Sequence, residues 1–309
     1  MRPTNSRAWL WYAIATLVLW GFWGAFTGIS AQRGFPDTLV YCVWSLTMIP
    51  PALLALARSG WRLDRDPGSM AYGLAIGLLG AGGQMLLFHT VTKGPAYLVF
   101  PVISLSPVVT ITLSYLLLRE RTTRLGGLGV VLALAALPLF DFQSQGLRDA
   151  GNSDWLPLSL VVMACWGVQA YFMKVANRTM SAESIFFYMM LTGLLLAPVA
   201  WAMTDFDQPI NWGADGPYLA ALIQVLNAVG ALLLVYAFRH GKALVVSPLT
   251  NAGAPLMTAV VSLLVIGVMP GTLKLVALGL ALMAALLLSL AEDGSSQAEV
   301  RPEPRPSLQ

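Results

Sequence analysis

Long apolar runs are the feature that most constrains how this chain can fold. A helix needs about 20 mostly apolar residues to cross the hydrocarbon core of a bilayer. Ten such runs can be drawn, at residues 9–30, 37–57, 69–92, 95–118, 124–141, 155–176, 182–203, 216–238, 243–267 and 271–291. Charged residues make up 11% of the 309, against roughly 25% in soluble domains. Because backbone polar groups cannot stay unpaired in lipid, the sequence predicts an all-α integral membrane protein with ten transmembrane helices.

The two ends of the chain differ from these runs. The first run follows Arg2 and Arg7, as in a secretion signal, but it is too long for the apolar core of one, so we assign it as the first span. From Glu292 onward the composition changes to Gly, Ser, Gln, Glu and Pro. This change predicts a disordered cytoplasmic tail at 293–309.

The distribution of Lys and Arg predicts the orientation, because cytoplasmic loops carry an excess of these residues. With a cytoplasmic N-terminus, the outer side holds few of the 18 basic residues, namely Arg33, Lys93, Arg148 and Lys274. We therefore predict a multi-pass protein of the inner (plasma) membrane with both termini cytoplasmic. The net charge of +3 is too small to indicate a nucleic-acid partner. The apolar runs make the lipid bilayer the expected surroundings of the protein.

One short motif occurs twice and predicts an internal repeat. Residues 92–101 read TKGPAYLVFP and residues 239–248 read RHGKALVVSP, with Gly, Ala, Val and Pro in one register. The first helix of each half also matches, with Trp20-Gly21 corresponding to Trp166-Gly167. Five helices in each half is an odd number, so the second half crosses the membrane in the opposite sense. The expected architecture is two inverted five-helix repeats, at 1–145 and 153–292, an arrangement common in secondary transporters.

These motifs resemble the drug/metabolite transporter superfamily, and more narrowly its EamA-type members. The resemblance rests on the 5+5 helices, on the Trp-Gly pairs, and on Gly241-Lys242-Ala243 with Pro248 between the eighth and ninth helices. Arg119-Glu120-Arg121 is similar to an acidic position common in that family, whereas the second half has Gly267-Val268-Met269 there. The resemblance covers about 9–291 and implies two EamA-like repeats and a secondary transporter, most often an exporter. It carries little information about the substrate.

Prolines at matched positions predict breaks in the fourth and ninth helices. A proline leaves the carbonyl four residues earlier without its helical donor. Irregular backbone of this kind persists in a bilayer only against protein or a water-filled cavity. We therefore expect gating at helix breaks marked by Pro101, Pro107, Pro248 and Pro255. The alternative is that each proline makes a simple kink without a functional role.

Aromatic and uncharged polar side chains near mid-span predict a binding site. Amides deep in a span usually face the protein interior, since lipid cannot satisfy their hydrogen bonds. Tryptophans near mid-span suit a pocket wall better than those at the ends, which anchor helices at the interface. The expected substrate-binding residues are Trp20, Gln84, Tyr97, Ser104, Trp166, Gln169, Asn227 and Asn251. The alternative for the amides is that they only tie helices together.

Residues that would support other chemistry are scarce in the spans. No Asp or Glu lies deep in a span, which disfavours carboxylate-based ion coupling. His89 is the one in-span titratable group and a candidate for proton coupling, although a lone histidine is more often structural. The sequence contains no phosphate-binding loop, zinc-ligand cluster or nucleophile-histidine arrangement at membrane depth. We therefore expect neither an enzyme nor a cofactor or metal.

The resulting hypothesis is a secondary transporter, driven without ATP, for a small neutral or zwitterionic metabolite such as an amino acid, an aromatic or a drug-like compound. One alternative is an anion or phosphorylated-metabolite exchanger, which needs Lys93, Lys174 or Arg239 to point inward. The other is a non-transporting scaffold or sensor with the same fold. Small-residue stripes on the fifth and tenth helices predict close packing within the monomer, with a homodimer as the alternative; they comprise Gly126, Gly129 and Ala133, and Ala281, Ala285 and Ser289.

Overall fold

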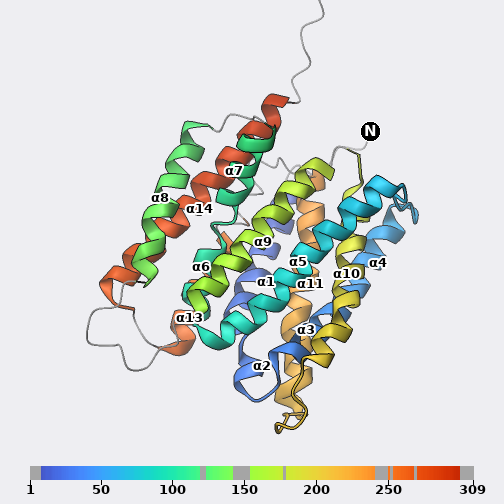
Figure 1. Ribbon diagram of the computed structural model, residues 1–309, viewed down its shortest axis with the longest axis vertical. Helices are drawn as coiled ribbons and strands as arrows, with labels where there is room; N and C mark the ends of the chain where they lie inside the picture. The colour runs from blue at the N-terminus through green and yellow to red at the C-terminus, as the bar shows by residue number, and fades with distance from the viewer. Residues whose placement is uncertain are drawn as a thin grey trace, which may run out of the picture.

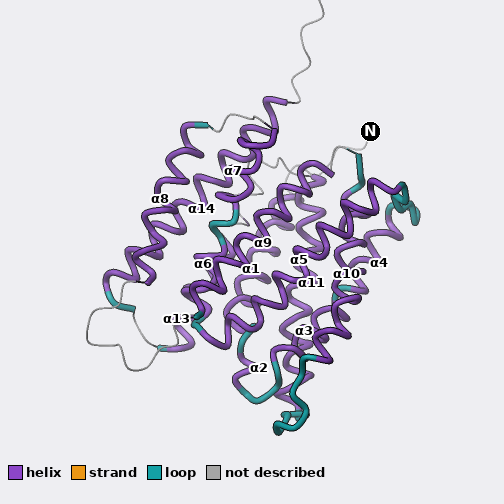
Figure 2. Tube along the Cα trace, in the orientation of Figure 1, coloured by secondary structure: helices purple, strands orange, loops and turns teal. Residues whose placement is uncertain are grey.

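The computed structural model describes residues 8–118, 123–141, 154–176, 179–240, 250, 253–267 and 270–299. Every regular element in these ranges is helical (Figures 1 and 2). The prediction of an all-α chain is therefore confirmed for the part of the sequence that the structure describes.

The helices of the first half are α1 (Ala8–Phe26), α2 (Ile29–Gln32), α3 (Asp37–Thr47), α4 (Ile49–Arg58), α5 (Pro67–Lys93), α6 (Ala96–Ile103), α7 (Pro107–Leu118) and α8 (Arg124–Asp141). Those of the second half are α9 (Trp155–Ala176), α10 (Ala182–Ala202), the π-helix η1 (Ala214–Tyr218), α11 (Leu219–His240), α13 (Gly253–Ile266) and α14 (Thr272–Glu299).

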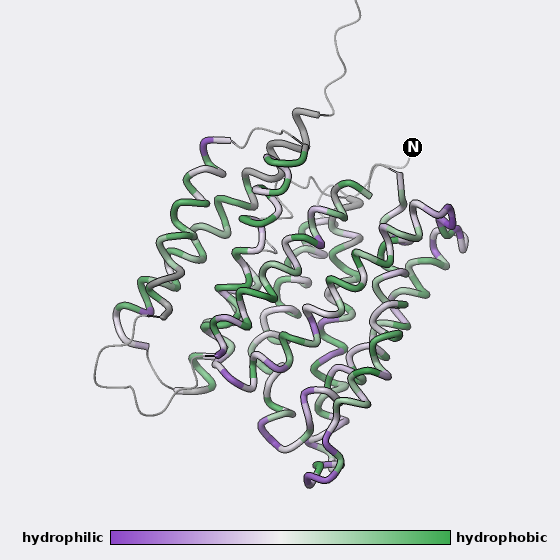
Figure 3. Tube along the Cα trace, viewed as in Figure 1, coloured by the Kyte–Doolittle hydropathy of each residue, from purple (hydrophilic) through white to green (hydrophobic). Residues whose placement is uncertain are grey.

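The lengths and composition of the helices fit a multi-pass membrane protein. Seven helical stretches of the described chain are long and apolar enough to cross a membrane. Three shorter apolar stretches, Arg124–Ala136, Gly253–Val265 and Thr272–Leu288, fall within three further expected spans. Figure 3 shows hydrophobic residues along the bundle and strongly hydrophilic ones mostly at its ends. The count of ten spans and their inverted relation stay predictions.

Two expected spans are divided by prolines. The span expected at 37–57 is interrupted at Met48, between α3 and α4, because Pro50 and Pro51 have no N–H for the preceding turn. The span expected at 95–118 is interrupted at residues 104–106, and Pro107 begins α7, where a helix needs no donor.

The structure corrects two details of these expectations. Pro101 does not break a helix: α6 continues through it, at the cost of the one bond that its missing N–H would have made to Tyr97. The tail expected from residue 293 begins as helix, since α14 extends to Glu299. No proline follows until Pro302, so the apolar turns of α14 can continue into this polar stretch.

Helices of one half pack mainly against helices of the other around the centre. Helix α1 packs against α11 and α13, and α9 packs against α5, α6 and α7. Helices α8 and α14 form one flank of the bundle, and α3, α4 and α10 lie at the opposite flank (Figure 1). The space between these two groups of helices is therefore bounded by both halves.

Candidate functional site

A cavity of about 340 Å³ lies at this centre, between helices of both halves. Aromatic residues contribute much of its apolar wall, namely Trp20, Trp23, Trp44, Phe100, Trp166 and Phe186. The polar side chains of the lining are uncharged, namely Gln84, Ser104, Ser106, Thr110, Gln169, Asn227, Thr250 and Thr258. No Asp, Glu, Lys, Arg or His is among the described residues that line the cavity. The size and the apolar character are typical of small-molecule sites.

The two tryptophans of the repeated motif hold matching positions in the cavity wall. The indole Nε1 of Trp20 donates to the backbone oxygen of Asn227 over 3.2 Å. The indole Nε1 of Trp166 donates to the backbone oxygen of Gly80 over 3.4 Å. Each hydrogen bond joins the first helix of one half to the third helix of the other, so both rings are fixed by the opposite half.

Two glycines make room for these rings. A Cβ atom on Gly83 would lie 2.6 Å from Nε1 of Trp166, and one on Gly230 would lie 2.6 Å from Nε1 of Trp20. Distances this short exclude any larger residue unless the indole moves. The close approach of α5 to α9, and of α11 to α1, therefore depends on a missing side chain in each case.

The other two tryptophans are held by amide side chains. The Nε1 of Trp23 donates to Oε1 of Gln224 over 2.8 Å, and its ring meets that of Phe100 edge-on with centroids 5.5 Å apart. The Nε1 of Trp44 donates to Oδ1 of Asn227 over 3.0 Å. With all four indole N–H groups engaged, these tryptophans offer the cavity their apolar ring surfaces.

Three hydroxyl groups of the cavity donate to nearby backbone carbonyls. Ser104 Oγ donates to the oxygen of Pro101 over 2.7 Å. Thr110 Oγ1 donates to the oxygen of Gly167 over 2.9 Å, and Thr258 Oγ1 donates to that of Gly21 over 3.2 Å. Because each hydroxyl has a single proton, these three oxygens are left with lone pairs only.

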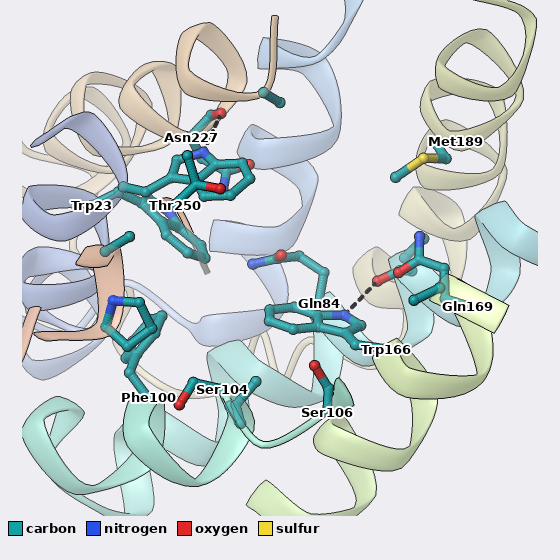
Figure 4. A pocket seen from close by; sticks show the side chains of 18 of the residues that line it. Trp23, Gln84, Phe100, Ser104, Ser106, Trp166, Gln169, Met189, Asn227 and Thr250 are labelled. Carbon is teal, nitrogen blue, oxygen red and sulfur yellow. Dashed lines mark hydrogen bonds between the residues drawn. The ribbon is translucent and has the colours of Figure 1, made fainter. Parts of the chain in front are cut away.

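Gln84 carries a buried amide nitrogen that departs from this pattern. The residue is 4% exposed, and its Nε2 has no hydrogen-bond partner among the described residues. Figure 4 shows the amide nitrogen reaching past the Trp166 ring toward the space near Trp23 and Phe100. A buried unpaired donor costs about 1–3 kcal/mol, so an orphaned amide that faces a cavity indicates an absent partner.

The structure brings most of the expected binding residues to this one cavity. Those that line it are Trp20, Gln84, Ser104, Trp166, Gln169 and Asn227, together with the expected gating prolines Pro107 and Pro255. Tyr97 instead packs against the apolar cluster of α6, α8, α9 and α14. Pro101 is buried but does not line the cavity. Asn251 and Pro248 lie outside the described residues.

His89 and Lys93 are not among the residues that line the cavity. The Nδ1 of His89 is 2.7 Å from Oδ2 of Asp37, and the His89 side chain is 47% exposed at the C-terminal end of α5. The histidine therefore joins α5 to α3 and does not reach the cavity. Lys93 is exposed, and the side chains of Lys174 and Arg239 are outside what the structure describes. Among the described residues, no cluster of His, Cys, Asp or Glu is suited to a metal.

Sequence reasoning missed several residues of the wall. Trp44 and Met48 come from the α3–α4 region, and Phe186 and Met189 from α10. Prolines 50 and 51 were an available signal for the first pair, because they mark a broken helix as Pro107 does. Phe186 and Met189 sit in a uniformly apolar helix whose sequence does not distinguish the cavity face from the others.

Comparison with known proteins places these features in a family. The model of the EamA-like transporter family matches residues 7–140 and again residues 154–290. The chain is 25% identical over 267 residues to Protein RarD of Streptomyces exfoliatus, covering 82% of this chain and 78% of that protein. It is 30% identical over 79 residues to the uncharacterized protein MJ1333.1 of Methanocaldococcus jannaschii, covering 26% of this chain and 58% of the relative.

A solved crystal structure shares the fold. It superposes with a TM-score of 0.62 at 19% identity, and the match covers 96% of this chain and 100% of the other. Similarity at this level of identity shows a common architecture and leaves substrate recognition to be argued from the residues of the cavity.

Proposed function

The chain belongs to the EamA-like transporter family, and on that premise we propose that it moves a small neutral or zwitterionic metabolite across the membrane by alternating access. The observation that carries the proposal is the uncharged, tryptophan-lined cavity between the two halves. A ligand with a net charge would be taken from water into this apolar site with no described counter-charge, at a cost of several kcal/mol. Amino acids and aromatic or drug-like compounds fit the lining.

Matched contacts between the halves support the alternating-access part of the proposal. The Trp20–Asn227 and Trp166–Gly80 hydrogen bonds form one matched pair. The Thr258–Gly21 and Thr110–Gly167 hydrogen bonds form another. Two inverted repeats would make such matched contacts around a shared site. If the two repeats exchanged conformations, the cavity would open first to one side of the membrane and then to the other.

The interrupted helices are the moving parts in this proposal. Residues 104–106 separate α6 from α7 beside the cavity, and Met48 separates α3 from α4 in its wall. Hinges of this kind concentrate a change of backbone dihedrals at a few residues at the ends of elements. The resemblance to EamA-type transporters supports export as the direction. The distribution of Lys and Arg supports an inner-membrane location with both termini cytoplasmic.

The test is a binding and transport experiment on the purified protein. Thermal stabilisation is measured with a metabolite panel sorted by charge, since a ligand at 100 times its dissociation constant stabilises by about 2.7 kcal/mol. Compounds that stabilise the protein are then followed by counterflow in proteoliposomes. Stabilisation and counterflow with neutral or zwitterionic compounds would support the proposal. Responses to phosphorylated compounds or other anions alone would contradict it and favour an exchanger, and binding without counterflow would favour a sensor.

A further inference from the structure

The donors and acceptors of the cavity are unevenly distributed. The hydroxyl protons of Ser104, Thr110 and Thr258 are committed to backbone carbonyls. These oxygens can therefore accept a hydrogen bond from a ligand but have no free proton to offer. The lining tryptophans have also used their N–H groups on protein acceptors. The donors that remain for a ligand include the amide side chains and the Ser106 hydroxyl.

Gln84 supplies the first such donor. Its Nε2 is enclosed, and no described residue accepts a hydrogen bond from it. The amide is aimed across the face of Trp166 toward the space near Trp23 and Phe100 (Figure 4). A buried N–H group that has no acceptor in the protein and is directed into a cavity can be matched by a hydrogen-bond acceptor on a ligand.

Asn227 supplies a second donor, and its orientation is fixed by its neighbour. The indole nitrogen of Trp44 is a donor only, so the Asn227 atom that faces it at 3.0 Å must be the carbonyl Oδ1. The amide Nδ2 is thereby turned away from Trp44. Asn227 is part of the cavity wall on α11, so Nδ2 is the donor that this side chain can offer to a ligand. Gln84 on α5 and Asn227 on α11 thus place one amide donor on each half of the protein.

Resting on the proposed transport function, we propose that the cavity selects compounds that present a carbonyl or carboxylate oxygen beside an apolar body. Gln84 Nε2 binds this oxygen, Asn227 Nδ2 provides the second donor, and Trp23 and Phe100 cover the apolar body. Two neutral donors suit a carboxylate only when the ligand carries its own cation, because no described lining residue supplies a positive charge. Amino acids and carboxamides present a carbonyl or carboxylate oxygen to these donors, and simple amines have no such oxygen.

The experiment compares two series of probes that share a body and differ in the acceptor group. One series is phenylalanine, phenylalaninamide and phenethylamine, and the other is leucine, leucinamide and isopentylamine. We expect the amide of at least one series to bind at least about tenfold more tightly than its amine at about pH 6, where both carry one positive charge and differ in the acceptor, the effect of one good hydrogen bond to a buried donor. Binding is measured by calorimetry on the detergent-purified wild-type protein, so this comparison needs no variant.

A substitution then assigns the preference to one atom. Gln84→Glu keeps the size of the side chain but replaces the N–H donor with a second acceptor, so the order should reverse and favour the amines. Gln32→Glu makes the same change at an exposed position of α2 and should keep the wild-type order. Gln84→Met removes the orphaned donor, and the ligand-free protein should melt about 2–4 °C higher.

The outcomes separate this inference from the proposed function. Amines that bind the wild-type protein as tightly as the amino acids and amides would overturn the acceptor preference and leave the transport function standing. An acceptor preference that persists in Gln84→Glu would overturn the role of Gln84. If no member of either series binds, both the acceptor preference and the proposed substrate class are wrong.

Discussion

The guanidinium group of Arg58 lies over the ring of Tyr236, 5.1 Å from its centroid, and donates a hydrogen bond to the Tyr236 hydroxyl. This contact joins the last turn of α4, in the first half, to α11, in the second. Tyr236 is 9% exposed and also packs against Tyr12 of α1, with centroids 5.8 Å apart. One arginine thus closes an aromatic cluster that links three helices at one end of the bundle.

We predict that Arg58 and Tyr236 are energetically coupled. In a double-mutant cycle, the variant with both Arg58→Ala and Tyr236→Leu should lose about 0.5–1 kcal/mol less stability than the sum of the two single losses. This is the range for a partly exposed cation over an aromatic ring. Chemical unfolding of the four proteins in detergent measures this coupling. Arg62→Ala, at an exposed position of the following loop, is the control and should be additive with Tyr236→Leu. Additivity for Arg58 as well would mean that the contact has no energetic weight.

Adjacent glycines of α5 should respond oppositely to alanine. A Cβ atom on Gly83 would meet Trp166 at 2.6 Å, so Gly83→Ala should lower stability by about 1–3 kcal/mol through overpacking. A Cβ atom on Gly82 would meet nothing within 4 Å, so Gly82→Ala should leave stability unchanged or raise it by up to about 1 kcal/mol through helix propensity. Melting temperatures of the two variants give the comparison, and a similar loss in both would contradict the packing of α5 against α9.

Asp64 should stabilise the protein in a pH-dependent way. Its Oδ2 accepts hydrogen bonds from the backbone N of Ser181 over 2.8 Å and from Ser181 Oγ over 3.0 Å, which ties the α4–α5 loop to the start of α10. The hydrogen bond from the Ser181 backbone, followed by those from the Ser181 and Ser184 hydroxyls, holds the pKa of Asp64 below its ordinary value of 3.8. A lowered pKa in the folded state means that the ionised carboxylate stabilises the fold above pH 3.8, and that this contribution is lost as the pH falls through the lowered pKa.

Asp64→Asn should therefore cost up to about 1 kcal/mol near neutral pH, and its deficit should shrink as the pH falls below 3.8. Unfolding curves of variant and wild type over this pH range measure the difference. Asp207→Asn, which changes an exposed aspartate of the loop before η1, is the matched control and should show no comparable loss. A deficit for Asp64→Asn that is the same at every pH would exclude the carboxylate charge as its cause.

The orientation can be tested with two single-cysteine positions. We expect Gln208→Cys, in the loop before η1, to react in intact cells with a maleimide that cannot cross the membrane. Arg62→Cys, in the loop after α4, should react only after the cells are opened. Both positions are exposed, whereas the native Cys42 and Cys165 are half-buried and give the background signal. The reverse pattern of labelling would mean that the termini are outside.

The sequence was most informative where a chemical requirement restricts the choice of residue. Apolar length predicted the helices, because a lipid environment allows few other structures. The matched Trp20 and Trp166 led directly to the cavity wall, and so did the amides of Gln84 and Asn227, which lipid could not satisfy. These positions are recognisable because few residue types can serve there.

The sequence was least informative where a role depends on distant partners. His89 looked like an isolated titratable group in a span, yet it pairs with Asp37, which lies 52 residues earlier in the chain. Tyr97 has the right depth and spacing for the cavity, but it lies on the face of α6 that packs against the apolar cluster with α8 and α14. Trp44 is held in the wall by its hydrogen bond to Asn227, a residue of the other half. Helical periodicity identifies faces of a helix and does not identify which neighbour covers each face.

The choice of acceptor for Trp20 and Trp166 has an evolutionary consequence. Both indoles bind a backbone carbonyl, which every residue has, so these hydrogen bonds place no demand on the side chains at positions 80 and 227. The two positions carry different residues: Gly80 leaves room for the amide of Gln169, while Asn227 carries an amide that engages Trp44. Two matched joints can therefore be kept while the cavity surface between them has no twofold symmetry. Few metabolites have that symmetry, so the side chains that line the cavity can fit an asymmetric molecule without changing the contacts that join the two halves.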